Sequence, residues 1–281
     1  MFNRLKTAVL LASLAGLMLF IGYLLGGYQG LTIGLIIALI FNFGSYWFSD
    51  RIVLAMYKAK EVKDQGHHLY KIVKDVSHLA NIPMPKVYII PSAQSNAFAC
   101  GRDYNHSAVA ATEGLLNLMN QDELKGVIAH EVSHIKNRDI LIQTIAATIA
   151  AVISYVAMMA RWAAIFGGFG GRDKNNSGIL EFLALAILAP ILALIIQLAI
   201  SRSREYLADA SAAKLLHSPF GLANALEKLD VDGKKNRMRL GNPSTAHMFI
   251  SNPFRGNFLM SILSTHPPAK SRIKKLRDMN I

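Results

Sequence analysis

The hydrophobic positions of this chain are gathered into long runs that contain no Asp, Glu, Lys or Arg. The first run covers 43 consecutive positions from Thr7 to Ser49, and shorter runs cover 140–160 and 182–201. A helix that crosses a bilayer needs about 20 such residues, so the first run is long enough for two crossings. The pattern therefore predicts four membrane helices, at about 7–26, 31–49, 140–160 and 182–201.

The distribution of Lys and Arg predicts on which side of the membrane each part lies. Of the 30 basic residues, 27 lie before the first run, in 50–139 or after 201, and the other three lie between the third and fourth helices. Cytoplasmic loops carry an excess of Lys and Arg, so we expect both chain ends to face the cytoplasm. The predicted organisation is two membrane helices in 1–49, a cytoplasmic segment at 50–139, two membrane helices with a short external loop at 140–201, and a cytoplasmic helical segment at 202–281.

Other interpretations of the composition are disfavoured. A secretory signal peptide would be shorter than the first run and would not be followed at once by a second span. With 52% apolar and 17% charged residues, and with Cys100 as the single cysteine, the chain is neither a disordered protein nor a disulfide-stapled one. The net charge of +12 follows the predicted topology, and no nucleic-acid-binding module accompanies it. We expect a multi-pass protein of the cytoplasmic (inner) membrane, with the lipid bilayer as a partner and no nucleic acid.

The segment 50–139 has the pattern of a mixed α+β domain. Apolar residues recur at helical spacing between Leu69 and Leu79. Lys86–Ile90 is a short apolar run with prolines on both sides, which is typical of a buried strand. Further strands are expected at Asn96–Cys100 and Ser107–Thr112, with a polar turn between them.

The strongest chemical signal is the H-E-x-x-H motif that begins at His130. Asn120, followed three positions later by Glu123, predicts the capped start of a helix that carries the motif. On a helix His130 and His134 lie one turn apart, so both imidazoles can reach one metal ion. Glu131 beside them is placed to act as the general base of a hydrolase. Two ordinary histidines on a solvated helix are the bland alternative, which the helical context disfavours.

A catalytic zinc site needs a third protein ligand, and that ligand is not local. The metzincin spacing is excluded, because Asn137 and Ile140 stand where that class has glycine and histidine. The metal helix runs almost directly into the third predicted span, so the third ligand must return to the same membrane surface. Glu205 follows the fourth span by four residues, and Asp209 lies one helical turn further on, where it could orient a ligand histidine. Glu205 is the favoured third ligand and Glu227 the alternative.

Taken together these residues resemble the HtpX-type membrane zinc metalloproteases, relatives of the CAAX prenyl-protein endopeptidases. The similarity rests on H-E-V-S-H-I-K-N-R-D from His130 and, two spans later, S-R-S-R-E-Y-L-A-D-A from Ser201. Asn96-Ala97-Phe98-Ala99 and the stretch Ser264–Pro268 belong to it as well. The resemblance implies a fold with four transmembrane helices and a zincin-like α+β domain. It also implies one Zn²⁺ per subunit bound by His130, His134 and Glu205, with Glu131 as the catalytic glutamate.

Further roles follow from the resemblance. The strand at Asn96, Ala97 and Phe98 could bind an extended substrate through its main chain, or it could be an interior strand. His266 could donate a hydrogen bond to the oxyanion, and Arg272 could pair with the carboxylates of the Glu205 helix. The remaining histidines are interpreted as surface or core residues.

The leading hypothesis is a membrane-anchored zinc endopeptidase that hydrolyses misfolded or damaged membrane proteins in quality control. A metal-binding scaffold or chaperone without peptidase activity would share the ligands but would not need Glu131. A transporter would place ionisable residues inside the spans, and the predicted spans contain none.

Overall fold

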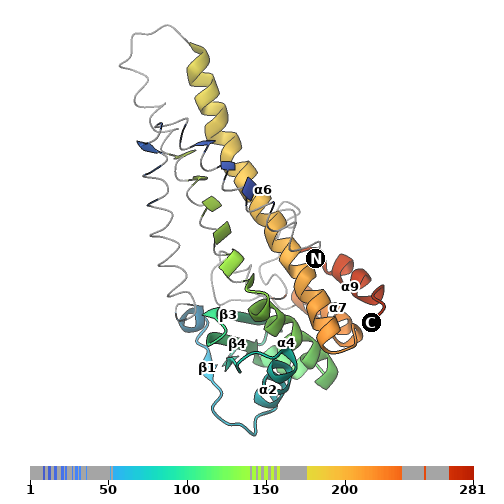
Figure 1. Cartoon of the computed structure of the whole chain (residues 1–281). Helices are drawn as coiled ribbons and strands as arrows, with labels where there is room; N and C mark the ends of the chain where they lie inside the picture. Colours follow the sequence, from blue (N-terminus) through green and yellow to red (C-terminus); the bar gives the residue numbers. More distant parts are fainter. Residues whose placement is uncertain are drawn as a thin grey trace. The chain divides into compact units, whose positions relative to one another are not determined.

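The computed structural model describes residues 51, 53–139, 176–235, 250 and 266–281, with scattered positions between 9 and 36 and between 141 and 158. The chain divides into two compact units (Figure 1). The first contains Met1–Ser45 and Ile142–Ile200, and the second contains Tyr46–Leu141 and Ser201–Ile281. The predicted helices at 7–26, 31–49 and 140–160 and the external loop fall largely outside the described residues and stay predictions.

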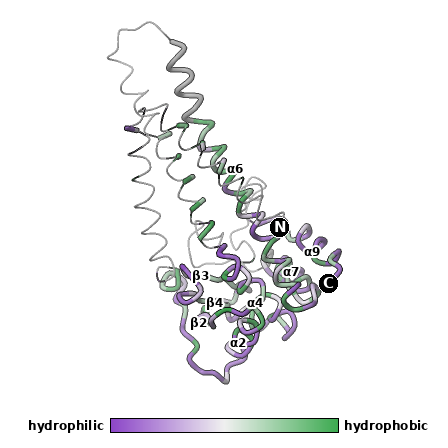
Figure 2. Tube along the Cα trace, in the orientation of Figure 1, coloured by the Kyte–Doolittle hydropathy of each residue, from purple (hydrophilic) through white to green (hydrophobic). Residues whose placement is uncertain are grey.

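The first unit contains most of α6, a 40-residue helix from Asn176 to Leu215. The part of α6 from Ile187 to Leu215 is long and apolar enough to cross a bilayer, and it is the one such segment among the described residues. Small residues of α6, Ala189 and Ala193, are buried, whereas neighbouring large apolar residues such as Ile191 and Ile195 are exposed. Small residues let membrane helices approach closely, and exposed Ile suits contact with lipid. Figure 2 shows how α6 changes from apolar residues to polar ones towards its C-terminal end.

The fourth predicted span and the Glu205 segment form one continuous helix. We predicted a domain boundary at 201. The two compact units divide between Ile200 and Ser201, and α6 continues across this point without a break and ends at Leu215. The stretch from Ser201 to Ala213 contains neither Gly nor Pro, so nothing in it interrupts the helix. Glu205 is therefore held by a helix rather than by a loop.

The second unit contains a four-stranded sheet in the order β1-β2-β4-β3. The strands are β1 (Lys60–Glu61), β2 (Lys86–Ile90), β3 (Ala97–Asp103) and β4 (His106–Thr112). β2 and β4 are parallel, and the other two pairs are antiparallel. The three strands that we predicted are confirmed, although β3 begins one residue later than expected and extends to Asp103.

Helices cover one face of this sheet. They are α2 (His68–Ala80) and α4 (Gln121–Lys136), and α4 packs against α2, β3 and α7 (Phe220–Lys235). The short helix α3 (Glu113–Leu118) follows β4, and α9 (Ala269–Arg277) packs against α7. Ala97 and Ala99 of β3 face the core that these helices form, and alternate residues such as Phe98 face the other side of the sheet, near Tyr57.

The start of α4 confirms the predicted helix cap. Asn120 Oδ1 accepts a hydrogen bond from the Glu123 amide at 2.9 Å, and Glu123 Oε2 accepts one from the Asn120 amide at 3.0 Å. Further along, Gly126 lets α7 approach closely: a Cβ there would lie 2.6 Å from the backbone nitrogen of Leu222. The helix that carries the H-E-x-x-H motif is thus capped at its first turn and packs closely against the backbone of α7.

Candidate metal centre

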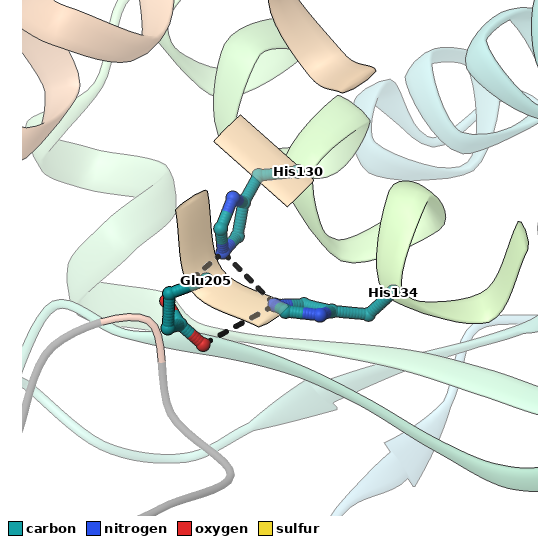
Figure 3. A group of neighbouring side chains, drawn as sticks. All are labelled: His130, His134 and Glu205. Carbon is teal, nitrogen blue, oxygen red and sulfur yellow. Dashed lines mark hydrogen bonds and ion pairs between the residues drawn. The ribbon is translucent and has the colours of Figure 1, made fainter. Parts of the chain in front are cut away.

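The two histidines of the motif and Glu205 come together from two helices (Figure 3). His130 and His134 lie one turn apart on α4, and Glu205 comes from α6. His130 Nε2 lies 3.1 Å from His134 Nε2 and 3.6 Å from Glu205 Oε2, and His134 Nε2 lies 3.5 Å from Glu205 Oε1. One ligand atom from each residue falls within 4.8 Å of the others. The structure therefore brings together the three residues that the sequence analysis selected.

This group has the dimensions and the chemistry of a catalytic zinc site. The ligand atoms of a tetrahedral zinc ion, each about 2.0–2.1 Å from the metal, lie about 3.3 Å apart. Two imidazole nitrogens and one carboxylate are one of the donor sets that catalytic zinc uses, with the fourth position left for water or substrate. The observed separations of 3.1 to 3.6 Å match that geometry.

A carboxylate orients the first histidine. Asp209 Oδ1 lies 3.0 Å from His130 Nδ1, and Arg272 donates to both oxygens of Asp209, at 2.9 and 2.7 Å. A carboxylate at Nδ1 fixes the proton on that nitrogen and leaves the Nε2 lone pair for a metal. The predicted contact between Arg272 and the carboxylates of α6 is present, since Arg272 Nη1 also lies 3.1 Å from Glu205 Oε2.

The second histidine has a matching arrangement, which the sequence analysis missed. His134 Nδ1 lies 2.7 Å from Asp139 Oδ2, and the other oxygen of Asp139 is paired with Arg204. Burial by itself would lower the pKa of His134, but its hydrogen bonds to Asp139 and Glu205 outweigh that effect and hold the pKa well above 6.5. The sequence offered one signal for this contact. Asp139 follows His134 by five residues and ends the stretch H-E-V-S-H-I-K-N-R-D on which the resemblance rests.

Glu205 is buried and surrounded by positive charge. Burial alone would raise its pKa, but His266 and Arg272 outweigh burial and hold the pKa of Glu205 well below its ordinary value. His266 Nδ1 lies 3.1 Å from Glu205 Oε2. Among the described residues, no donor has hydrogen-bond geometry to Glu205 Oε2, and neither ring nitrogen of His266 has a hydrogen-bond partner. Buried polar atoms in this state are expected where a bound ion or substrate completes the site.

Glu131 lies next to the ligands and is buried. Burial raises the pKa of its carboxyl, and the positive charges of His130 and His134 offset part of that rise. The backbone amide of Ala99 in β3 donates a hydrogen bond to it. A carboxylate with a raised pKa is suited to accept a proton and to release it again at neutral pH.

The predicted substrate strand lies beside this group. Asn96 pairs with Thr112 of β4 through its main chain, so by alternation the main chain of Ala97 faces away from β4. On that outer side the Ala97 carbonyl accepts a hydrogen bond from the amide of Ile250 at 3.1 Å, and the Ile250 carbonyl accepts one from Arg272. The side chain of Phe98 is buried on the face of the sheet that points away from α4.

Other candidate residues lie outside the group. Glu227, the alternative third ligand, is exposed and pairs with Arg277 at 2.9 Å. His67 caps α2, and His106 pairs with Asp103 in the β3–β4 turn. A cavity of about 130 Å³ adjoins the metal group, lined by His134, Ile135, Arg138 and the β3–β4 turn.

Comparison with known proteins finds that the sequence of this chain is similar to peptidases. The model of peptidase family M48 matches residues 63–280. A protease HtpX homolog of Desulforapulum autotrophicum is 54% identical, with 99% of this chain and 90% of that protein covered. Homologs of the same name are 50% identical in Syntrophobacter fumaroxidans, with 99% and 100% covered, and 51% identical in Pyrococcus furiosus, with 98% and 95% covered.

Among solved structures, the crystal structure of S. mikatae Ste24p has a similar fold. The TM-score is 0.59 at 19% sequence identity, and the match covers 99% of this chain and 66% of that one. At that identity the likeness concerns the fold alone.

Proposed function

The chain belongs to peptidase family M48, and on that premise we propose that His130, His134 and Glu205 bind one zinc ion with which Glu131 hydrolyses peptide bonds. The family and its relatives named as proteases, together with the membrane-capable helix in α6, make the protein a membrane-anchored metalloprotease. A scaffold or chaperone without peptidase activity is not favoured, because these relatives are proteases and the glutamate of the motif is present. The observation that carries the proposal is the convergence of three ligand atoms with both histidines held at Nδ1 by aspartates.

Glu131 acts as the proton carrier of the reaction. A zinc ion held by the three ligands would supply the Lewis acid that polarises the scissile carbonyl and acidifies a water molecule. Glu131 takes a proton from the attacking water and delivers it to the leaving nitrogen, as its raised pKa allows. Its hydrogen bond from the Ala99 amide holds the carboxylate between β3 and the ligands.

His266 and Arg272 have supporting roles. His266 is buried beside Glu205 without a hydrogen-bond partner among the described residues, so a ring N–H is available to the oxyanion that develops on the substrate. Arg272 orients Asp209 and thereby His130, and it neutralises part of the buried negative charge.

The substrate binds as an extended strand along the outer side of β3. Ala97 and Phe98 of β3, with Asn96 directly before them, form the stretch along which the substrate lies. The Ala97 carbonyl accepts a hydrogen bond from the main chain of the substrate. The residue that now donates to this carbonyl, Ile250, has to give way to the substrate main chain or to share the strand with it. The cavity beside His134 offers space for a substrate side chain.

The active site faces the cytoplasm, and membrane proteins in need of quality control are the substrates. Support comes from the excess of Lys and Arg in 50–139 and after 201, and from α6, which joins a membrane-capable stretch to the ligand Glu205 within a few residues. This topology has four spans, both chain ends in the cytoplasm and a multi-pass anchor in the inner membrane.

The test compares Glu131→Gln, Glu205→Gln and Glu227→Gln in detergent-purified full-length protein. Bound zinc and casein cleavage are measured, with a chelator and with added zinc. We expect Glu131→Gln to keep one zinc per chain and to lose at least about 10²-fold in cleavage rate. Glu205→Gln should lose both zinc and cleavage, and the exposed Glu227→Gln should behave as the parent. Cleavage by metal-loaded Glu131→Gln at the parent rate would contradict the proposed mechanism.

A further inference from the structure

Asp139 reaches His134 because the chain turns back after α4. The helix is capped at Asn137, and Arg138 adopts a left-handed conformation with φ of 56°. This turn returns Asp139 to the last turn of α4, where its Oδ2 lies 2.7 Å from His134 Nδ1. Asp139 is fully buried at 0% exposure, so its carboxylate depends on protein partners rather than on water.

Arg204 supplies the partner. It pairs with Asp139 Oδ1, and its Nη2 donates to the carbonyl of Asn137 at 2.8 Å. The two oxygens of Asp139 are thus divided between His134 and Arg204. Arg204 belongs to α6 and precedes the ligand Glu205 directly, so one short stretch of α6 supplies a metal ligand and the arginine that fixes the carboxylate at another ligand.

We propose that Asp139 and Arg204 are positioning residues that hold His134 in its metal-binding orientation. The inference rests on the proposed function, since it concerns the same metal site. Together with Asp209 and Arg272 at His130, each histidine then has its own aspartate and its own arginine. A carboxylate behind a ligand histidine fixes its ring and raises its basicity, and its loss commonly weakens metal binding 10–100-fold.

The charges of the site support this role. Four buried carboxylates, those of Glu131, Asp139, Glu205 and Asp209, stand against two buried arginines. A bound dication would balance the two remaining negative charges. Arg204 compensates the charge of Asp139 through one oxygen and leaves the other oxygen for His134.

The experiment measures zinc binding by Asp139→Ala, Asp139→Asn, Arg204→Gln and the double variant Asp139→Asn with Arg204→Gln. All are made in full-length Glu131→Gln protein, so that peptide hydrolysis by the protein itself cannot disturb the measurement. Zinc affinity is taken from competition with a chromogenic chelator, and the Co²⁺-substituted protein gives an absorption spectrum that reports the ligand geometry. Asp122→Ala, an exposed aspartate in the first turn of α4, and Arg277→Ala are the matched controls.

We expect Asp139→Ala to bind zinc about 10–100-fold more weakly with an altered Co²⁺ spectrum. Asp139→Asn should lose less, because its side-chain oxygen can still accept from His134 Nδ1–H. The double variant should lose less than the two single losses combined, because the two residues act on one histidine. Both controls should match the parent.

Thermal unfolding separates this role from a purely structural one. A positioning role reduces the rise in melting temperature that zinc produces. A purely structural role instead lowers the melting temperature by the same amount with zinc and without it. Folded Asp139→Ala and Arg204→Gln proteins with parental zinc affinity and Co²⁺ spectrum would overturn the inference. Failure of the parent itself to bind zinc would instead overturn the proposed function.

Discussion

Asp209→Ala should affect the stability of the fold and the metal site together. Asp209 accepts two hydrogen bonds from Arg272, a side chain that is 1% exposed, and it holds His130 Nδ1. Removing one partner of a buried ion pair commonly lowers the free energy of unfolding by about 3–5 kcal/mol. Arg272 would keep two contacts, with Glu205 Oε2 and the Ile250 carbonyl, so we expect the lower end, about 3 kcal/mol.

The magnitude can be checked by melting the metal-free protein in detergent. A loss of about 3 kcal/mol corresponds to a fall of about 6–12 °C for a domain of this size. Zinc affinity should fall about 10–100-fold in addition, because His130 loses the group that fixes its ring.

The exposed pair between Glu227 and Arg277 offers the control. Both side chains are 47% exposed, and such surface pairs contribute about 0–1 kcal/mol. Arg277→Ala should therefore leave the melting temperature and zinc affinity almost unchanged. If Asp209→Ala melted and bound zinc as Arg277→Ala does, then the buried network would have neither of the roles assigned to it.

Two further predictions concern the metal ligands and the helix that carries them. Hydrogen bonds to the partners at Nδ1 and Nε2 outweigh burial and raise the pKa of both His130 and His134 above 6.5. Protons therefore compete with the metal for these nitrogens at pH values around and above 6.5. Zinc affinity should rise as the pH is increased through that range, and chelator competition that gave one affinity at every pH would contradict this. Gly126→Ala should lower the free energy of unfolding by about 1–3 kcal/mol, since the added Cβ would lie 2.6 Å from the Leu222 nitrogen. Denaturant unfolding measures that loss, and a midpoint equal to the parent's would show that α4 and α7 can separate freely.

Features that depend on neighbouring residues could be predicted from the sequence. The strand Lys86–Ile90 has the predicted bounds, and the capping box of Asn120 and Glu123 is present. In both cases the signal and the structure lie within a few positions of each other. The same holds for His130 and His134, whose spacing requires only that the segment be helical.

Residues from distant parts of the chain were harder to predict. Glu205 was selected by elimination from its place after the fourth predicted span, with Glu227 left open. Arg272 was selected through resemblance to a family. Asp139 was missed because its partner Arg204 lies 65 residues away, and no local pattern shows that an arginine of α6 points at the end of α4.

By itself, then, the sequence determined the chemistry of this protein: a helix with two imidazoles and a carboxylate, and apolar runs suited to a membrane. The tertiary structure decided which distant carboxylates and arginines complete the group. Asp209 meets His130 because α6 lies beside α4, and Asp139 meets His134 because the chain turns back after α4 and Arg204 of α6 holds the carboxylate there. Helical periodicity extends over a few turns, whereas the pairing of buried charges depends on how side chains from separate elements point towards each other.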